Sequence, residues 1–152
     1  MKLLFNLSFL FSIFFLAHPA SAQTVTINQQ INFGRFALAD NNAERRIIFS
    51  LGNTFAADPQ YIFFNEPEMG EVTLDDFPPN TQIEVSIGIT TLRHNAVPRF
   101  NLRNTFTDPE TITTDNTGSA FFRVGGTLLS DGGGSSPADG DYSGIFTVSA
   151  AP

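Results

Sequence analysis

The residues of this chain that could support catalysis are mainly carboxylates. Five acids lie close together along the sequence: Glu66, Glu68, Glu71, Asp75 and Asp76. Two opposed carboxylates suffice for glycoside hydrolysis, because one serves as the acid and the other as the base or nucleophile. Acids spread over turns are more often the solvated rim of a β-sandwich, and the chain has no tryptophan to form a sugar platform. We therefore expect no enzymatic activity and no catalytic residue.

Histidine chemistry is also poorly supported. His94 lies in the polar stretch Thr91–Asn95 and is expected to be an exposed loop residue. The chain contains no G-x-S-x-G elbow, no H-E-x-x-H helix and no phosphate-binding glycine loop. Hydrolytic triads therefore have no candidate base.

A calcium site is the remaining chemical alternative. Asp131, Asp139 and Asp141 share one glycine-rich segment, and carboxylate oxygens are the ligands that calcium prefers. Their spacing matches no EF-hand, and Asp-Gly is a common hairpin turn pair. The chain also has no cysteine, which removes disulfides and thiolate metal sites. We expect neither a metal nor a cofactor, and interpret the segment as a flexible hairpin loop.

The charge balance restricts the partners. The 152 residues include 15 acidic and 8 basic side chains, for a net charge of -7. An acidic surface repels phosphate backbones and anionic lipid headgroups, so nucleic acid is not an expected partner.

The first segment has the pattern of a secretory signal peptide. Lys2 precedes an apolar run from Leu3 to Leu16, and Ala20-Ser21-Ala22 forms a small-residue cleavage site. Cleavage between Ala22 and Gln23 is expected, leaving 23–152 as a single domain. The apolar run is too short to cross a bilayer, and no later segment is long and apolar enough to do so.

Alternation of apolar residues by two dominates the rest of the chain and predicts strands. It is clearest in Val25-x-Ile27 and in the run Ile83, Val85, Ile87 and Ile89. Turn signals such as Asp115-Asn116-Thr117-Gly118 separate such segments. This pattern predicts an antiparallel β-sandwich or barrel of roughly seven to nine strands with almost no helix.

The stretch from Gln23 to Ile31 is extended, alternating and free of proline and glycine. Such a strand can pair within its own domain, or it can be donated to an incomplete neighbouring subunit. The residues alone favour an ordinary first strand.

Three short motifs resemble a known family. They are Ile31-Asn32-Phe33-Gly34, Gly125-Gly126-Thr127-Leu128 and the ending from Gly140 to Val148. They resemble the secreted bacterial domain of unknown function 4402, which is similar to spore coat protein U and archaic chaperone–usher pilin domains. Gly125 and Gly126 are independently expected to permit a bulge or a close approach between strands.

The resemblance implies an immunoglobulin-like, pilin-like sandwich in the periplasm or at the cell surface of a Gram-negative bacterium. Val25, Ile27 and Ile31 would be donated side chains, and Tyr142, Gly144, Phe146 and Val148 would alternate along the last strand beside the groove. The expected function is a secreted, non-catalytic structural or adhesion subunit that assembles by donor-strand pairing. Its partners would be itself or a related secreted subunit, with a periplasmic chaperone as a further implied partner.

The alternative function is a monomeric secreted sandwich that binds a glycan or small ligand through its loops. Tyr61, Phe63 and Phe64 beside Glu66 are the candidate contact residues. Because Ile62-Phe63-Phe64 is a continuous apolar run, these aromatics are more simply interpreted as core.

Overall fold

The fold is built entirely from strands in the part of the chain that is described. The computed structural model describes residues 22–88, 91–94, 97–135 and 137–152, with the backbone alone for 97–99. The predicted signal peptide, except Ala22, lies outside these residues, as does Ile89. Within them no helix has the length and hydrophobicity needed to cross a bilayer. The prediction of an all-β protein is confirmed.

Twelve strands are present among the described residues, more than the seven to nine expected. The strands are β1 (Thr24–Gln29), β2 (Arg35–Leu38), β3 (Arg46–Ser50), β4 (Thr54–Ala57), β5 (Tyr61–Asn65), β6 (Gly70–Asp75), β7 (Gln82–Gly88), β8 (Thr91–His94), β9 (Val97–Asp108), β10 (Ile112–Thr113), β11 (Ala120–Ser130) and β12 (Thr147–Ala151). The excess comes from β2, β4, β8 and β10, strands of two to four residues. Their apolar alternation is too short to recognise, and each pairs with a longer strand.

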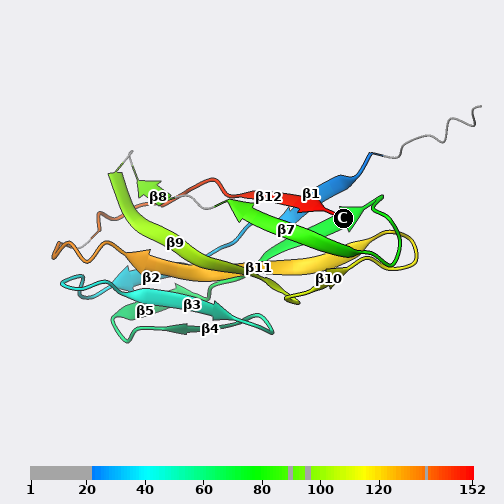
Figure 1. The fold of residues 1–152 in the computed structure, drawn as a ribbon. Helices are drawn as coiled ribbons and strands as arrows, with labels where there is room; N and C mark the ends of the chain where they lie inside the picture. The colour runs from blue at the N-terminus through cyan, green and yellow to red at the C-terminus, as the bar shows by residue number, and fades with distance from the viewer. Residues whose placement is uncertain (1–21, 89–90, 95–96, 136) are drawn as a thin grey trace, which may run out of the picture.

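The strand order is that of an immunoglobulin-like sandwich. In one sheet β1, β6, β11 and β9 are successive neighbours, and β7 pairs with β12 in the facing sheet (Figure 1). In chain order these strands correspond to A-B-E-D and C-F of an immunoglobulin domain. The outer edge of β12, where strand G would pair, has no partner among the described residues.

The long strand β11 joins two apolar clusters. Its first half pairs with β6 and its second half with β3, while β9 runs along its other edge. The sandwich core between β6, β11 and the β7–β12 sheet includes Val72, Leu74, Phe122 and Val124. The second cluster is formed mainly by β3, β9 and the end of β11, with aromatic residues of β2 and β5 packed against it.

The glycine pair in β11 allows close packing, as predicted. The register between β11 and β9 is irregular between Gly125 and Thr127. A Cβ on Gly125 would lie 2.7 Å from the Phe106 ring and 2.8 Å from the Met69 methyl group. Side chains of the second cluster therefore occupy the space that a larger residue at 125 would need.

The predicted turn at Asp115 is organised by its carboxylate. Asp115 Oδ1 accepts hydrogen bonds from the backbone N–H groups of Thr117 (2.8 Å) and Ser119 (3.0 Å) and from the Thr117 hydroxyl (2.6 Å). The hydroxyl of Thr117, followed by these backbone donors, lowers the pKa of Asp115 below its ordinary value of 3.8, because all of them favour the charged form.

This turn predicts a specific acid sensitivity. Since the folded pKa lies below the unfolded value, the stabilisation is complete above pH 3.8 and is lost as the pH falls through the folded pKa. Thermal unfolding of the wild type and of Asp115→Asn, measured from neutral pH to about pH 2, should show a gap in Tm that closes on acidification. A gap that stays constant over that range would contradict this role for the carboxylate.

Candidate functional site

Among the described residues, the N-terminal strand β1 is paired along one edge only, by β6. Val25 stands opposite Leu74 and Ile27 opposite Val72, so both face the core side of the sheet. They nevertheless remain 36% and 43% exposed, whereas Leu74 and Val72 are 0% exposed. The apolar side of β1 is therefore only partly covered, although the strand pairs within its own chain.

The facing sheet ends beside β1 and leaves this side uncovered. β12 approaches β1 without forming a ladder with it (Figure 1). Neither strand has a paired neighbour on its outer edge among the described residues. Such edges present N–H and C=O groups to which another chain can pair.

The third predicted donor residue, Ile31, behaves differently. It lies beyond the end of β1 and packs, partly buried, against both apolar clusters. The structure thus separates it from Val25 and Ile27, which are the two exposed aliphatic residues of β1.

The four residues predicted to alternate along the last strand do not act together. Phe146 and Val148 pack against the sandwich core, and Val148 pairs with Ile87. Tyr142 instead joins the second cluster, with its ring 5.0 Å from that of Phe100. The alternation is broken because the bridge between Ser143 and Arg93 precedes β12, and Gly144 is exposed between the two.

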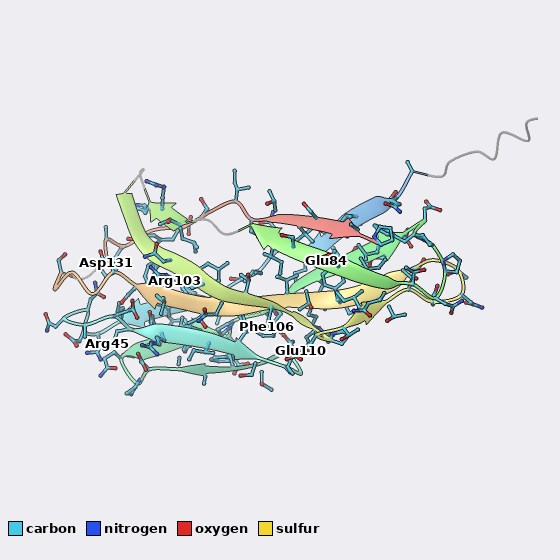
Figure 2. The ribbon with its side chains drawn as sticks, viewed as in Figure 1. Arg45, Glu84, Arg103, Phe106, Glu110 and Asp131 are labelled. Atoms are coloured by element: carbon cyan, nitrogen blue, oxygen red, sulfur yellow. The ribbon has the colours of Figure 1, made fainter. Side chains whose placement is uncertain are left out.

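A pocket that the sequence did not indicate opens on the opposite side of the sandwich. It lies between β7 and β9 and has a volume of about 330 Å³. We call it the β7–β9 slot, and its lining residues are Val85, Ile87, Thr105, Phe106, Thr107 and Glu110. Figure 2 shows Glu84 on β7 and, on the β9 side, Phe106 and Glu110.

The slot exists because two edge strands have short partners. β10 pairs with only Gln82 and Ile83 of β7, and β8 pairs with β9 no further than Asn101. The later part of each strand is left without a neighbour on that side among the described residues. Pairing lengths depend on how distant segments meet, which is why alternation within β7 did not reveal the slot.

One of three comparisons with known proteins identifies a family for this chain. The family described as "Domain of unknown function (DUF4402)" matches residues 23–151. The chain belongs to the DUF4402 family. No curated protein and no solved structure matched.

The five acids of this DUF4402 chain are spread over the two ends of β6. Glu66 and Glu68 precede β6, whereas Asp75 and Asp76 lie at its other end. At about 3.4 Å of rise per strand residue, Glu68 and Asp75 are more than 20 Å apart, beyond the roughly 5 to 10 Å that either mechanism needs. Glu71 forms an ion pair with Arg123 at 3.4 Å.

Two aspartates of the glycine-rich loop, Asp131 and Asp141, contact residues of other segments. Asp131 accepts a hydrogen bond of 2.6 Å from the Asn41 side chain, and no group of three or more potential ligands is arranged for a metal within the described residues. The carbonyl oxygen of Asp141 lies 3.0 Å from Nδ1 of His94. The expectation of an exposed loop histidine is wrong, since His94 is half-buried in β8 because the loop folds over it.

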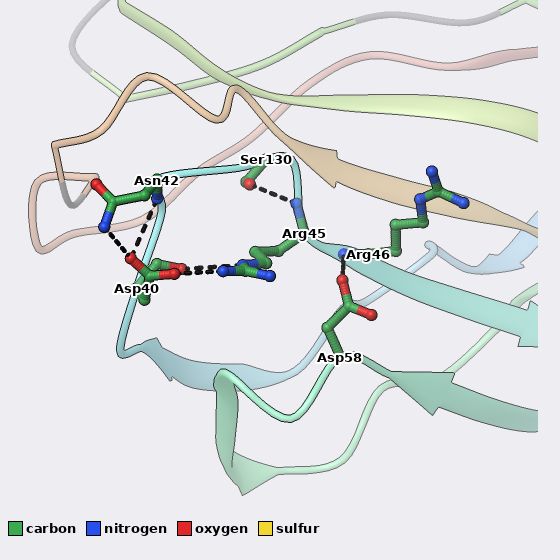
Figure 3. A network of polar contacts seen from close by, with 6 residues as sticks. All are labelled: Asp40, Asn42, Arg45, Arg46, Asp58 and Ser130. Atoms are coloured by element: carbon green, nitrogen blue, oxygen red, sulfur yellow. Dashed lines mark hydrogen bonds and ion pairs between the residues drawn. The ribbon is translucent and has the colours of Figure 1, made fainter.

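A polar network fixes the neighbouring turn (Figure 3). Asp40 forms an ion pair with Arg45 and accepts a 2.6 Å hydrogen bond from the Asn42 side chain. The Arg45 guanidinium is the main cause of the lowered pKa of Asp40. The backbone N–H of Arg45 also donates to Ser130 Oγ at 3.0 Å. These contacts join the turn between β2 and β3 to the end of β11, so we assign the network a structural role.

The alternative ligand patch is mostly core in the DUF4402 fold. Tyr61 is buried, and Phe63 packs against the second cluster with its ring 5.3 Å from Phe55. Phe64 alone is exposed, at 66%, with the Arg35 guanidinium 5.9 Å from its ring centroid. Successive residues of β5 face opposite sides, so the three aromatics cannot form one contact surface.

Proposed function

We propose that this DUF4402 chain is an exported, non-catalytic structural or adhesion subunit that assembles by donating β1 to a neighbouring subunit. The observation that carries the proposal is the state of β1. It is an edge strand with one paired neighbour in the part of the chain that the structure describes, and its two core-side aliphatic residues remain 36% and 43% exposed. Pairing with another copy or a related subunit would bury both side chains and satisfy the open main-chain groups of the receiving edge.

Two further observations support this function. The family match begins at Gln23, directly after the predicted cleavage site, which fits an exported protein of the periplasm or surface of a Gram-negative bacterium. Within the described part of the chain, the strand order leaves the position of strand G beside β12 without a strand. An immunoglobulin-like domain with an unfilled edge is suited to accept a strand, or to be held by a periplasmic chaperone until it does.

Self-association of the exported chain tests this proposal. Replacing Val25 and Ile27 with serine removes the apolar side chains that docking would bury, at about 0.8 kcal/mol per buried methylene. We expect the double variant to associate at least about tenfold more weakly in sedimentation experiments. The matched control is Thr24→Ser with Thr26→Ser, because these residues lie on the other face of β1 and should leave association unchanged.

A truncated chain and hydrogen exchange test the same proposal in two further ways. If β1 is donated, a chain lacking residues 23–31 should stay monomeric and bind a synthetic peptide of that sequence. A wild-type chain that is monomeric at high concentration, with the β1 amides as protected as those of β6, would refute the proposal.

A further inference from the structure

We infer that residues 31–34 form an anchor that stays in its own subunit while β1 is donated, so that the chain hinges at Gln30. We call residues 31–34 the anchor. This inference rests on the proposed function and adds to it the limit of the exchanged segment. It also moves Ile31 from the predicted donor residues to the part of the chain that does not leave.

β1 is the first part of a longer antiparallel ribbon. The chain from β1 to β2 runs antiparallel to the chain from β5 to β6, and an isolated bridge lies between the two ladders (Figure 1). Three pairs at equal steps show that the register is the same across this gap: Gln29–Glu71, Asn32–Glu68 and Arg35–Asn65. β1 is therefore continuous with β2, and its donation requires a point at which the chain parts from the ribbon.

The pairing of β1 is interrupted just before the anchor. A bulge lies between Ile27 and Gln29, and residues 30 and 31 belong to neither strand. A bulge leaves one residue unpaired and bends its strand. Hinges are formed by a few residues at the ends of such elements, and Gln30 directly follows the end of β1. The break in pairing therefore places the hinge at Gln30.

Ile31 fills a space that Gly70 leaves open. A Cβ on Gly70 would lie 3.0 Å from Cγ1 of Ile31 and 3.3 Å from its backbone nitrogen. Glycine at the start of β6 thus lets the Ile31 side chain pack, partly buried, against both apolar clusters. Withdrawing Ile31 would expose apolar surface of both clusters to water, whereas Val25 and Ile27 are already 36% and 43% exposed.

Hydrogen bonds fix the backbone of the anchor. The Asn32 N–H donates to the Glu68 carbonyl oxygen at 2.9 Å, and the Glu68 N–H donates to the Asn32 carbonyl oxygen at 2.7 Å. The Gly34 N–H donates to Asn32 Oδ1 at 2.9 Å. Gly34 has a φ of +77°, and a Cβ there would overlap the carbonyl oxygen of Asn65. The anchor is therefore held by paired main-chain bonds and by a close backbone approach that only glycine permits.

The hinge limits the reach of the donated strand. The six residues of β1 span about 20 Å at about 3.4 Å per residue. The receiving edge of the neighbouring subunit must therefore lie within about 20 Å of the donor's Gln30. Two subunits joined in this way are in direct contact rather than connected by a long arm.

Two disulfide staples test the hinge, because the natural chain has no cysteine. Thr26→Cys with Thr73→Cys joins β1 to its own β6, since these residues stand directly opposite each other. Arg35→Cys with Asn65→Cys joins the ribbon beyond the anchor in the same way. Opposite residues of antiparallel strands have Cα atoms about 4.5 to 5.5 Å apart, which a disulfide can bridge. Oxidation in dilute solution keeps each disulfide within one chain.

We expect the disulfide between positions 26 and 73 to weaken self-association at least about tenfold in sedimentation experiments, because β1 can no longer leave β6. Reduction of the same variant should restore association and is its matched control. The disulfide between positions 35 and 65 should leave association as it is in the reduced form, because the ribbon beyond the anchor does not move.

Hydrogen exchange of the dilute wild type gives a second readout. The β1 amides should have protection factors at least about tenfold lower than that of the Asn32 N–H, because β1 opens locally while the anchor stays closed. Equal protection of β1 and the anchor would show that they open as one unit and would overturn the hinge.

The outcomes separate this inference from the proposed function. If both disulfides prevent association, the exchanged segment extends into β2, and the hinge is wrong while the proposed function stands. If neither disulfide weakens the association seen in the reduced forms, β1 does not leave β6, and both are overturned. Absence of association in the wild type would also overturn both.

Discussion

Replacing Phe122 with alanine is expected to lower the free energy of unfolding by about 3 to 5 kcal/mol. Phe122 is 0% exposed and packs in the sandwich core between β11 and the β7–β12 sheet. Interiors are packed too densely to collapse fully around a missing ring, so a cavity term adds to the lost transfer free energy. Denaturant unfolding should show a lower midpoint at an unchanged m-value.

The matched control for this substitution is the preceding residue. Phe121 is 48% exposed on the other face of β11, where the Arg123 guanidinium lies 5.5 Å from its ring centroid. Phe121→Ala loses the same atoms but leaves no cavity, and should cost less than about 1 kcal/mol. If both substitutions lowered the free energy of unfolding equally, the alternation of buried and exposed residues along β11 would be wrong at these positions.

Gly118→Ala is expected to destabilise the fold by about 2 to 5 kcal/mol, through backbone strain and steric overlap together. Gly118 has a φ of +85°, and a Cβ there would overlap the carbonyl oxygen of Phe77. The Phe77 N–H also donates to the Gly118 carbonyl oxygen at 3.1 Å, so the two segments cannot separate without losing that hydrogen bond. Because Phe77 belongs to the sandwich core, the shift would extend into it.

Gly52→Ala isolates the conformational part of that cost. Gly52 has a similar φ of +79°, but nothing lies within 4 Å of where its Cβ would be. This variant should lose only the roughly 1 to 2 kcal/mol that an L-residue incurs in the left-handed region. Thermal or denaturant unfolding of both variants measures how much each is destabilised. The amount by which Gly118→Ala exceeds Gly52→Ala is the cost of steric overlap, and equal destabilisation would exclude such a cost.

These stability predictions bear on the proposed assembly because β1 lies at the edge of a sandwich core that is buried within one chain. Val72, Leu74 and Phe122 are fully buried without any partner chain, whereas Val25 and Ile27 are not. Exchange of β1 would remove the strand that stands opposite Val72 and Leu74, so its cost includes their exposure until another strand takes its place.

The period-two alternation was enough to predict an all-β sandwich, because each strand of a sandwich has one side in the core. It placed Ile83, Val85 and Ile87 on one strand, and the turn-forming residue types from Asp115 to Gly118 predicted the turn there. It could not predict the short strands β2, β4, β8 and β10, which depend on a partner rather than on their own pattern.

Site residues were predictable only where local alternation sets the outcome. Val25 and Ile27 share a face, as expected, but Tyr142 does not share one with Phe146, because the chain bridges to Arg93 before β12 begins. The aromatics at 61–64 divide between core and solvent for the same reason that strand residues alternate.

The strand class and the apolar, uncharged character of β1 could therefore be predicted, because both follow from residue type and spacing along the chain. Tertiary structure decided that β1 pairs with β6 at a half-covered edge, and that β7 and β9 leave a slot between them. Those features depend on which distant segments meet and how far each ladder extends, and neither quantity is encoded in local periodicity.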